Sequence, residues 1–162
     1  MIIYAISGKL KTGKTTLANL LPYKRIAFGD ILKQEVSETL GIPLEDLYNE
    51  NKAKYRKILQ WYGTDYRRAQ DPLYWVKKFD LLLPDEPIIV DDVRFIEEAE
   101  YCKSKGAKLI RLEPYEGYSY YSNHRSETAL DNYNFDAIFY PGFGKLKELT
   151  EGLINGTTHH SL

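Results

Sequence analysis

The chain has 162 residues, of which 43% are hydrophobic and 28% charged, a composition typical of one compact folded domain rather than of a disordered chain. The net charge of −1 argues against a nucleic-acid-binding groove, and the single cysteine, Cys102, excludes an intrachain disulfide. The apolar run at the N-terminus is too short to span a membrane, so we expect a cytoplasmic protein without a membrane partner.

Short apolar runs alternate with helical patterns along the chain. The runs that read as strands are Ile2–Ile6, Arg25–Phe28, Pro87–Val90, Ala107–Leu112 and Phe135–Phe139. Helices are predicted at residues 15–21, 31–40, 43–62, 71–83, 96–105 and 146–154, and several of them end at Gly or Pro. This alternation predicts an α/β fold with a parallel five-stranded sheet that carries helices on both faces.

The segment from Gly8 to Thr15 matches the phosphate-binding pattern G-x-x-x-x-G-K-[ST] at every fixed position. It follows a predicted strand and precedes a predicted helix, which is the context that this loop requires. Its glycines allow backbone N–H groups to point at phosphate oxygens. We therefore predict an ATP site in which Lys14 reaches the β- and γ-phosphates and Thr15 ligates Mg²⁺. The residues predicted to contact ATP are Gly8, Lys11, Thr12, Gly13, Lys14, Thr15 and Thr16.

Asp91 and Asp92 follow the predicted strand Pro87–Val90 directly. The carboxyl ends of parallel strands meet at one edge of a sheet, so one of these carboxylates is expected beside the phosphate-binding loop and near Mg²⁺. Adjacent side chains on an extended segment point to opposite faces, and only one of the two can therefore serve the metal. The residue types do not decide between them.

Arginines are the second chemical feature of the chain. A kinase that acts on a small phosphorylated acceptor needs guanidinium groups for the second phosphate. Five arginines lie at predicted turns, helix ends or polar helix faces: Arg56, Arg67, Arg68, Arg94 and Arg125. A guanine-nucleotide switch would need an Asn-Lys-x-Asp segment for the base, and the nearest string, Asn51-Lys52-Ala53-Lys54, lacks the aspartate.

Five short motifs occur in order between about Ile2 and Leu153. The first is the phosphate-binding loop, and the second is Ala27-Phe28-Gly29-Asp30-Ile31-Leu32-Lys33. The third is Arg56-Lys57-Ile58-Leu59-Gln60, followed by Gly63-Thr64-Asp65, Arg68 and Tyr74-Trp75-Val76. The fourth is Val90-Asp91-Asp92-Val93-Arg94-Phe95 with Glu98, and the fifth is His124-Arg125-Ser126-Glu127 followed by Phe135-Asp136. In this order the motifs resemble those of the deoxynucleoside monophosphate kinases of bacteriophages, a group within the P-loop nucleoside monophosphate kinases. Three positions depart from the family pattern: Asn123 replaces an Asp, Arg125 a Pro and Tyr140 an Asn.

The resemblance implies a role for each matching residue. It implies that Asp30, Lys33, Arg56, Arg68 and Arg94 surround the acceptor nucleotide. Gln60 would contact the base by hydrogen bonding and Trp75 by stacking, although packing in the core explains Trp75 equally well. The resemblance also implies an acceptor-binding insertion at about residues 30–85 and a lid at about 113–127. Arg125 would reach the transferring phosphate from this lid.

We therefore expect a nucleoside monophosphate kinase that transfers the γ-phosphate of ATP to a deoxynucleoside 5′-monophosphate (dNMP). Its catalytic residues would be Lys14, Arg94 and Arg125, and its metal site would combine Thr15 with Asp91 or Asp92. The partners would be ATP, a dNMP and possible further copies of the chain in a homodimer, in the host cytoplasm if a bacteriophage encodes it. Two alternatives remain at this point: a P-loop kinase of another phosphorylated metabolite, and a nucleotide-binding regulator without turnover.

Overall fold

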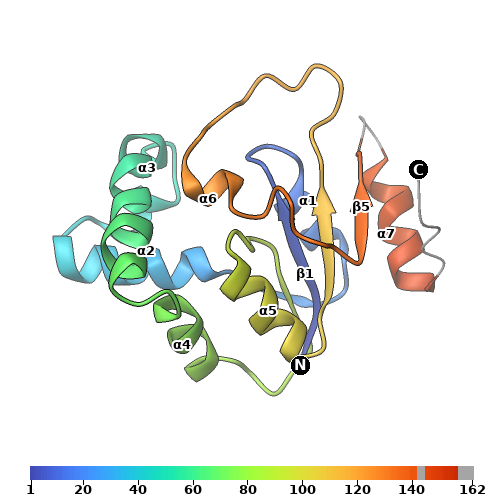
Figure 1. Cartoon of the computed structure of the whole chain (residues 1–162), viewed down its shortest axis with the longest axis horizontal. Helices are drawn as coiled ribbons and strands as arrows, with labels where there is room; N and C mark the ends of the chain where they lie inside the picture. The colour runs from blue at the N-terminus through green and yellow to red at the C-terminus, as the bar shows by residue number, and fades with distance from the viewer. Residues whose placement is uncertain (142–144, 157–162) are drawn as a thin grey trace. The chain divides into compact units, whose positions relative to one another are not determined.

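The computed structural model describes residues 1–141 and 145–156. The described residues form two compact units. The first combines Met1–Ile26 with the chain from Pro84 onward and contains the sheet, and the second, Ala27–Leu83, is helical (Figure 1). Each unit is described by itself. The second unit covers nearly the same stretch as the insertion expected at about residues 30–85.

In the described part of the first unit, five parallel strands form one sheet in the order β2-β3-β1-β4-β5. The strands are β1 (Ile2–Gly8), β2 (Lys24–Ile26), β3 (Ile88–Val90), β4 (Lys108–Leu112) and β5 (Ala137–Phe139). This confirms the predicted fold class. β1 is the central strand and pairs with both β3 and β4. The chain segments that follow β1 and β3 therefore leave the same edge of the sheet side by side.

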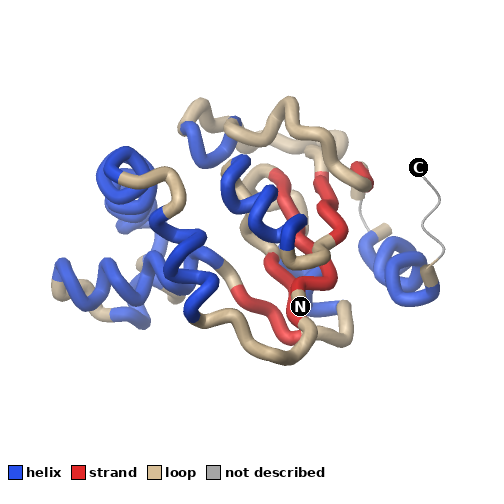
Figure 2. Tube along the Cα trace, turned by 60° about the horizontal axis from the view of Figure 1, so that its bottom comes forward, coloured by secondary structure: helices blue, strands red, loops and turns tan. Residues whose placement is uncertain are grey.

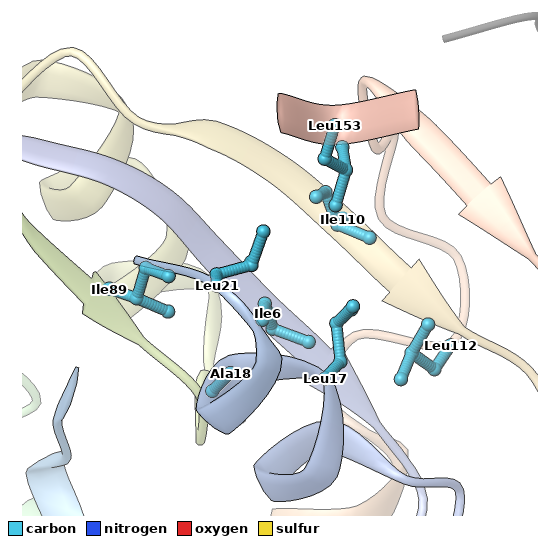
Figure 3. Close-up of a cluster of buried hydrophobic side chains, with 8 residues drawn as sticks. All are labelled: Ile6, Leu17, Ala18, Leu21, Ile89, Ile110, Leu112 and Leu153. Carbon is cyan, nitrogen blue, oxygen red and sulfur yellow. The ribbon is translucent and has the colours of Figure 1, made fainter. Parts of the chain in front are cut away.

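Two helices cover one face of this sheet, α1 (Lys14–Leu20) and α7 (Leu146–Asn155). Leu17, Ala18 and Leu21 pack with Leu153 of α7 on strand residues that include Ile6, as Figure 3 shows. Burying each large aliphatic side chain contributes about 1.5–3 kcal/mol to the free energy of folding. The phosphate-binding loop between β1 and α1 is thus anchored at both ends by buried apolar contacts.

Helix α5 (Ile96–Ser104) contacts β1 and β4 and lies on the other side of the sheet from α1 (Figure 1). Its buried residues include Ala99 and Cys102. Burial raises the pKa of the Cys102 thiol, so this cysteine stays neutral and packs as a small apolar side chain. The sheet therefore has helices on both faces, as its runs of apolar residues predict.

The second unit contains five consecutive helical segments: α2 (Phe28–Leu40), η1 (Leu44–Leu47), α3 (Lys52–Gln60), η2 (Trp61–Arg68) and α4 (Tyr74–Leu81). The phenyl rings of Phe28 and Phe79 pack 4.4 Å apart between α2 and α4. No helix in the described parts of the two units is long and apolar enough to cross a membrane.

The prediction of a single helix at residues 43–62 is wrong. The structure has a short 3₁₀ turn, a break and then α3, because polar side chains at the break bond to each other and to the backbone. Asn51 N–H donates to the side chain of Asn49, and both asparagines donate to Asp46. Gly63 also does not end the helix as predicted, since the chain continues through it as the π-helix η2.

Residue Phe28 was predicted to end a strand but begins α2, because β2 stops at Ile26. The helix predicted at residues 31–40 therefore starts earlier, at Phe28, and includes Asp30 as well as Lys33.

Candidate active site

The phosphate-binding loop runs from the end of β1 to the start of α1, and its glycines have backbone conformations that other residues rarely adopt. Gly8 has φ 154°, and a Cβ there would lie 2.6 Å from the carbonyl oxygen of Leu112. Gly13 has φ 97° and begins the turn into Lys14. Lys11 also has a positive φ, 62°, an uncommon value for a residue with a side chain. The loop therefore depends on both glycines of its motif.

Lys14 folds back over this loop. Its Nζ donates to the carbonyl oxygen of Lys9 at 2.6 Å, and the hydroxyl of Thr12 donates to the same oxygen at 2.8 Å. The ammonium of Lys14 is thus held next to the backbone that the motif predicts to bind phosphate.

The charge of Lys14 is disfavoured in the folded protein. Burial, and to a smaller degree the neighbouring Arg94, lower the pKa of Lys14 to about 8, although Glu127, Asp91 and Asp92 act in the opposite direction. An anion placed beside Lys14 would stabilise the ammonium and raise its pKa again.

This shift predicts that binding of ATP at the loop depends on pH. Above a pH of about 8 the nucleotide-free protein increasingly holds Lys14 neutral, so ATP must bind together with a proton. We expect the Kd for ATP to rise with pH above about 8, towards a limit of about tenfold per pH unit. Isothermal titration calorimetry in buffers of different ionisation enthalpy measures both the Kd and the proton uptake. In Lys14→Ala the proton uptake should disappear, and its persistence there would assign the linkage to another group.

Asp91 is the carboxylate that meets the loop. It is buried, and its Oδ2 accepts hydrogen bonds from the hydroxyl of Thr15 at 3.0 Å and from Nε of Arg25 at 2.6 Å. Its other oxygen, Oδ1, is buried and makes no hydrogen bond within the described residues. A buried carboxylate oxygen without a donor, next to a threonine hydroxyl, suits a hydrated divalent cation. These residues therefore fit Mg²⁺, and the contact with Thr15 favours Asp91 over Asp92.

Arg94 is fixed at both its backbone and its side chain. Its N–H donates to Oε2 of Glu98 at 2.8 Å, in the first turn of α5. Its Nη1 donates to Oε1 of Glu127 at 2.5 Å. The other oxygen of Glu127 accepts from the backbone N–H of Leu10 at 3.2 Å. The structure thus brings Arg94 to the phosphate-binding loop through Glu127.

The segment expected to form a lid is a long loop that leads into the short helix α6 (Arg125–Thr128), as Figure 2 shows. The hydroxyl of Tyr118 donates to the carbonyl oxygen of Leu10 at 2.7 Å, and the ring of Tyr118 packs against that of Tyr115. Arg125 is exposed, with its guanidinium 5.9 Å from the ring of Phe95. Closure of this segment and a catalytic role for Arg125 stay predictions.

A further set of charges supports the loop and was missed from the sequence. Nζ of Lys9 donates to Asp131 at 2.7 Å and to the backbone oxygen of Glu127 at 2.6 Å. Asp131 also accepts from Arg111, which is buried in β4 and bonds to Ser7. An arginine between Ile110 and Leu112 in a largely apolar strand was the available signal. Arg25, which contacts Asp91, left no comparable signal because its short strand is largely exposed.

In the second unit, two of the predicted acceptor residues share a partner. The hydroxyl of Tyr48 donates to Asp30 at 2.8 Å, and Nζ of Lys33 lies 4.1 Å from the centre of the Tyr48 ring. Arg56 and Gln60 are both half-buried on α3. The nucleotide contacts of these four residues stay predictions.

Trp75 belongs to the core of the second unit. Its side chain is 2% exposed, and its indole N–H donates to the carbonyl oxygen of Gly63 at 2.9 Å. The structure therefore supports the packing explanation and corrects the prediction that Trp75 stacks on a base. Arg68 is also largely buried, and its Nη1 contacts the carbonyl oxygen of Pro72 at 3.5 Å.

Glu35 organises the second unit in a way that the sequence did not reveal. Its buried carboxylate accepts from Tyr62, Arg67 and Tyr74 at 2.8–2.9 Å and also from Lys78. Burial raises the pKa of Glu35, but the hydrogen bonds from Lys78, Tyr74 and Tyr62 outweigh burial and lower it. The carboxylate thus joins α2, η2 and α4, which carry most of the predicted acceptor residues.

Comparison with known proteins gives one informative relative. The chain is 26% identical over 143 residues to a protein of Acanthamoeba polyphaga mimivirus named "Putative deoxynucleotide monophosphate kinase". The match covers 70% of this chain and 74% of the relative. No family model matches the chain. The relative's name agrees with the family that the sequence motifs resemble.

Proposed function

We propose that the protein is a nucleoside monophosphate kinase that transfers the γ-phosphate of ATP to a dNMP, forming ADP and a dNDP. The observation that carries the proposal is the complete phosphate-binding loop with Lys14 folded over it and Asp91 bonded to Thr15. The kinase named in the mimivirus relative and the acceptor motifs of the second unit support the nucleotide as substrate.

The reaction has little need of a general base, because the attacking oxygen of a dNMP phosphate is already anionic at neutral pH. The chain's work is to position the two phosphates and to neutralise their charge. Lys14 and the loop N–H groups would hold the donor phosphates. Arg94 would bind the acceptor phosphate, since a guanidinium can donate two parallel hydrogen bonds to phosphate oxygens.

Mg²⁺ completes the donor side. Thr15 would ligate it and Asp91 would hold one of its waters, and the bound ion would neutralise charge on the β- and γ-phosphates. Arg25 would hold Asp91 in this orientation, because its Nε bonds to the same carboxylate oxygen as Thr15.

The two aspartates after β3 should differ in their effect. Asp91→Asn should lower kcat and raise the Mg²⁺ concentration needed for half-maximal activity by about tenfold or more, because it removes a buried charge beside Thr15. Asp92→Asn is the matched control and should change the Mg²⁺ requirement much less. A Mg²⁺ titration of activity checks both. A larger shift in Asp92→Asn than in Asp91→Asn would exchange the two roles.

A coupled assay of ADP release tests the function itself. The assay is run with ATP, Mg²⁺ and, in turn, the four dNMPs, the ribonucleoside monophosphates and a set of phosphorylated metabolites. We expect ADP release to depend on a dNMP. Release that depends only on a metabolite would assign the protein to another class of kinase. ATP binding without acceptor-dependent release would make it a nucleotide-binding regulator.

A further inference from the structure

Glu127 occupies a position that the phosphate-transfer chemistry alone does not explain. It lies in α6 of the first unit, and its side chain is 1% exposed. Each of its carboxylate oxygens has a different partner: Oε1 accepts from Nη1 of Arg94, and Oε2 accepts from the backbone N–H of Leu10. Burying a carboxylate is costly unless it is paired and hydrogen-bonded, and these two donors meet that need.

The two hydrogen-bond donors to Glu127 belong to the proposed binding sites of two different substrates. Leu10 belongs to the loop predicted to hold ATP, whereas Arg94 is the residue proposed to hold the acceptor phosphate. One buried carboxylate therefore links the loop to this guanidinium. Since Glu98 holds the backbone N–H of Arg94, the side chain is restrained at both ends.

The positive charges of Lys14 and Arg94 also favour a carboxylate at the position of Glu127. The cationic Arg94 disfavours the charged form of Lys14, and Glu127 favours it. Glu127 accepts a hydrogen bond from one nitrogen of the Arg94 guanidinium, Nη1. Within the described residues, the side chain that bonds to this guanidinium is that of Glu127. The remaining N–H groups of Arg94 can therefore bind an anion while the guanidinium stays in place.

We propose that Glu127 is a positioning residue that holds the guanidinium of Arg94 against the phosphate-binding loop, in the orientation that binds the acceptor phosphate. The inference rests on the proposed function for the identity of that acceptor. It predicts that Glu127 acts on the acceptor through Arg94, and not by contact with a substrate.

A double-mutant cycle tests this dependence. Glu127→Gln keeps the size of the side chain but removes the charge and one acceptor oxygen. We expect it to raise the KM and the Kd for a dNMP by about ten- to a hundredfold, the scale of a hydrogen bond between charged groups, with the Kd for ATP changed by less than about threefold. In Arg94→Ala the same substitution should add almost nothing, because residues that act through one contact are not additive.

Asp131→Asn is the matched control. Asp131 ties the same segment to the loop through Lys9 but is not bonded to Arg94. It should therefore leave the acceptor KM nearly unchanged, even if the melting temperature falls. Should Glu127→Gln not fold, Glu127→Asp is the second variant, because it keeps the charge but is one methylene too short to reach both partners and must also raise the acceptor KM.

The outcomes separate this inference from the proposed function. Full additivity of Glu127→Gln and Arg94→Ala, or an equal rise in the ATP and acceptor constants, would overturn the positioning role. The cycle is also measured as the Kd of each dNMP by calorimetry, without turnover. If the wild-type protein transferred no phosphate but the binding cycle stayed non-additive, the proposed kinase activity would fail and the role of Glu127 would stand.

Discussion

Lys14→Ala is expected to lower the rate of phosphoryl transfer by at least about 10²-fold, the scale for removing one preorganised charge from an active site. The ammonium lies 2.6 Å from the carbonyl oxygen of Lys9, inside the loop that the motif predicts to surround the phosphates. Steady-state kinetics of acceptor-dependent ADP release measures the effect.

The substitution should not destabilise the fold. The pKa of Lys14 falls from 10.5 to about 8 on folding, so its charge destabilises the folded protein. That cost is fully present below a pH of about 8 and disappears as the pH rises towards 10.5. Alanine removes it, and the melting temperature at neutral pH should stay constant or rise.

Lys24→Ala is the matched control for Lys14→Ala. Lys24 is an exposed lysine of β2 whose Nζ pairs with Glu86 at 2.8 Å. Its replacement should leave the kinetics unchanged. Near-wild-type turnover in Lys14→Ala would contradict the kinase assignment as a whole.

Arg94→Ala is expected to reduce kcat/KM for the dNMP by about 2–4 kcal/mol of transition-state stabilisation, the loss of a bidentate contact between guanidinium and phosphate. The Kd for ATP should change little. Initial rates over a matrix of ATP and dNMP concentrations give both constants.

Arg94→Lys tests whether charge alone is sufficient at this position. A lysine keeps the cation but loses the planar pair of donors, so it should recover only part of the lost kcat/KM. A loss of ATP affinity in Arg94→Ala, with the acceptor KM unchanged, would place Arg94 on the donor side.

The sequence by itself predicted the parts of the protein that depend on local patterns. Buried parallel strands are runs of apolar residues, so the strands of the described sheet were found within a few residues of their observed ends, and only the exposed β2 lacks such a run. The phosphate-binding loop was found because its backbone requires glycine at Gly8 and Gly13, and that requirement is visible in the residue types. Local patterns failed between residues 43 and 68, where hydrogen bonds among Asp46, Asn49 and Asn51 interrupt the expected helix.

Only the tertiary structure decided which side chains meet. Two adjacent aspartates are equivalent in the sequence, and the contact with Thr15 distinguishes Asp91. Trp75 could stack on a base or pack in the core until its indole N–H was placed on Gly63. Leu10 and Glu127 are 117 positions apart, and the burial of Glu127 between Leu10 and Arg94 depends on how strands and helices pack together. No local pattern encodes such a contact, because the free energy that holds it comes from segments that are distant in the chain and meet only after folding.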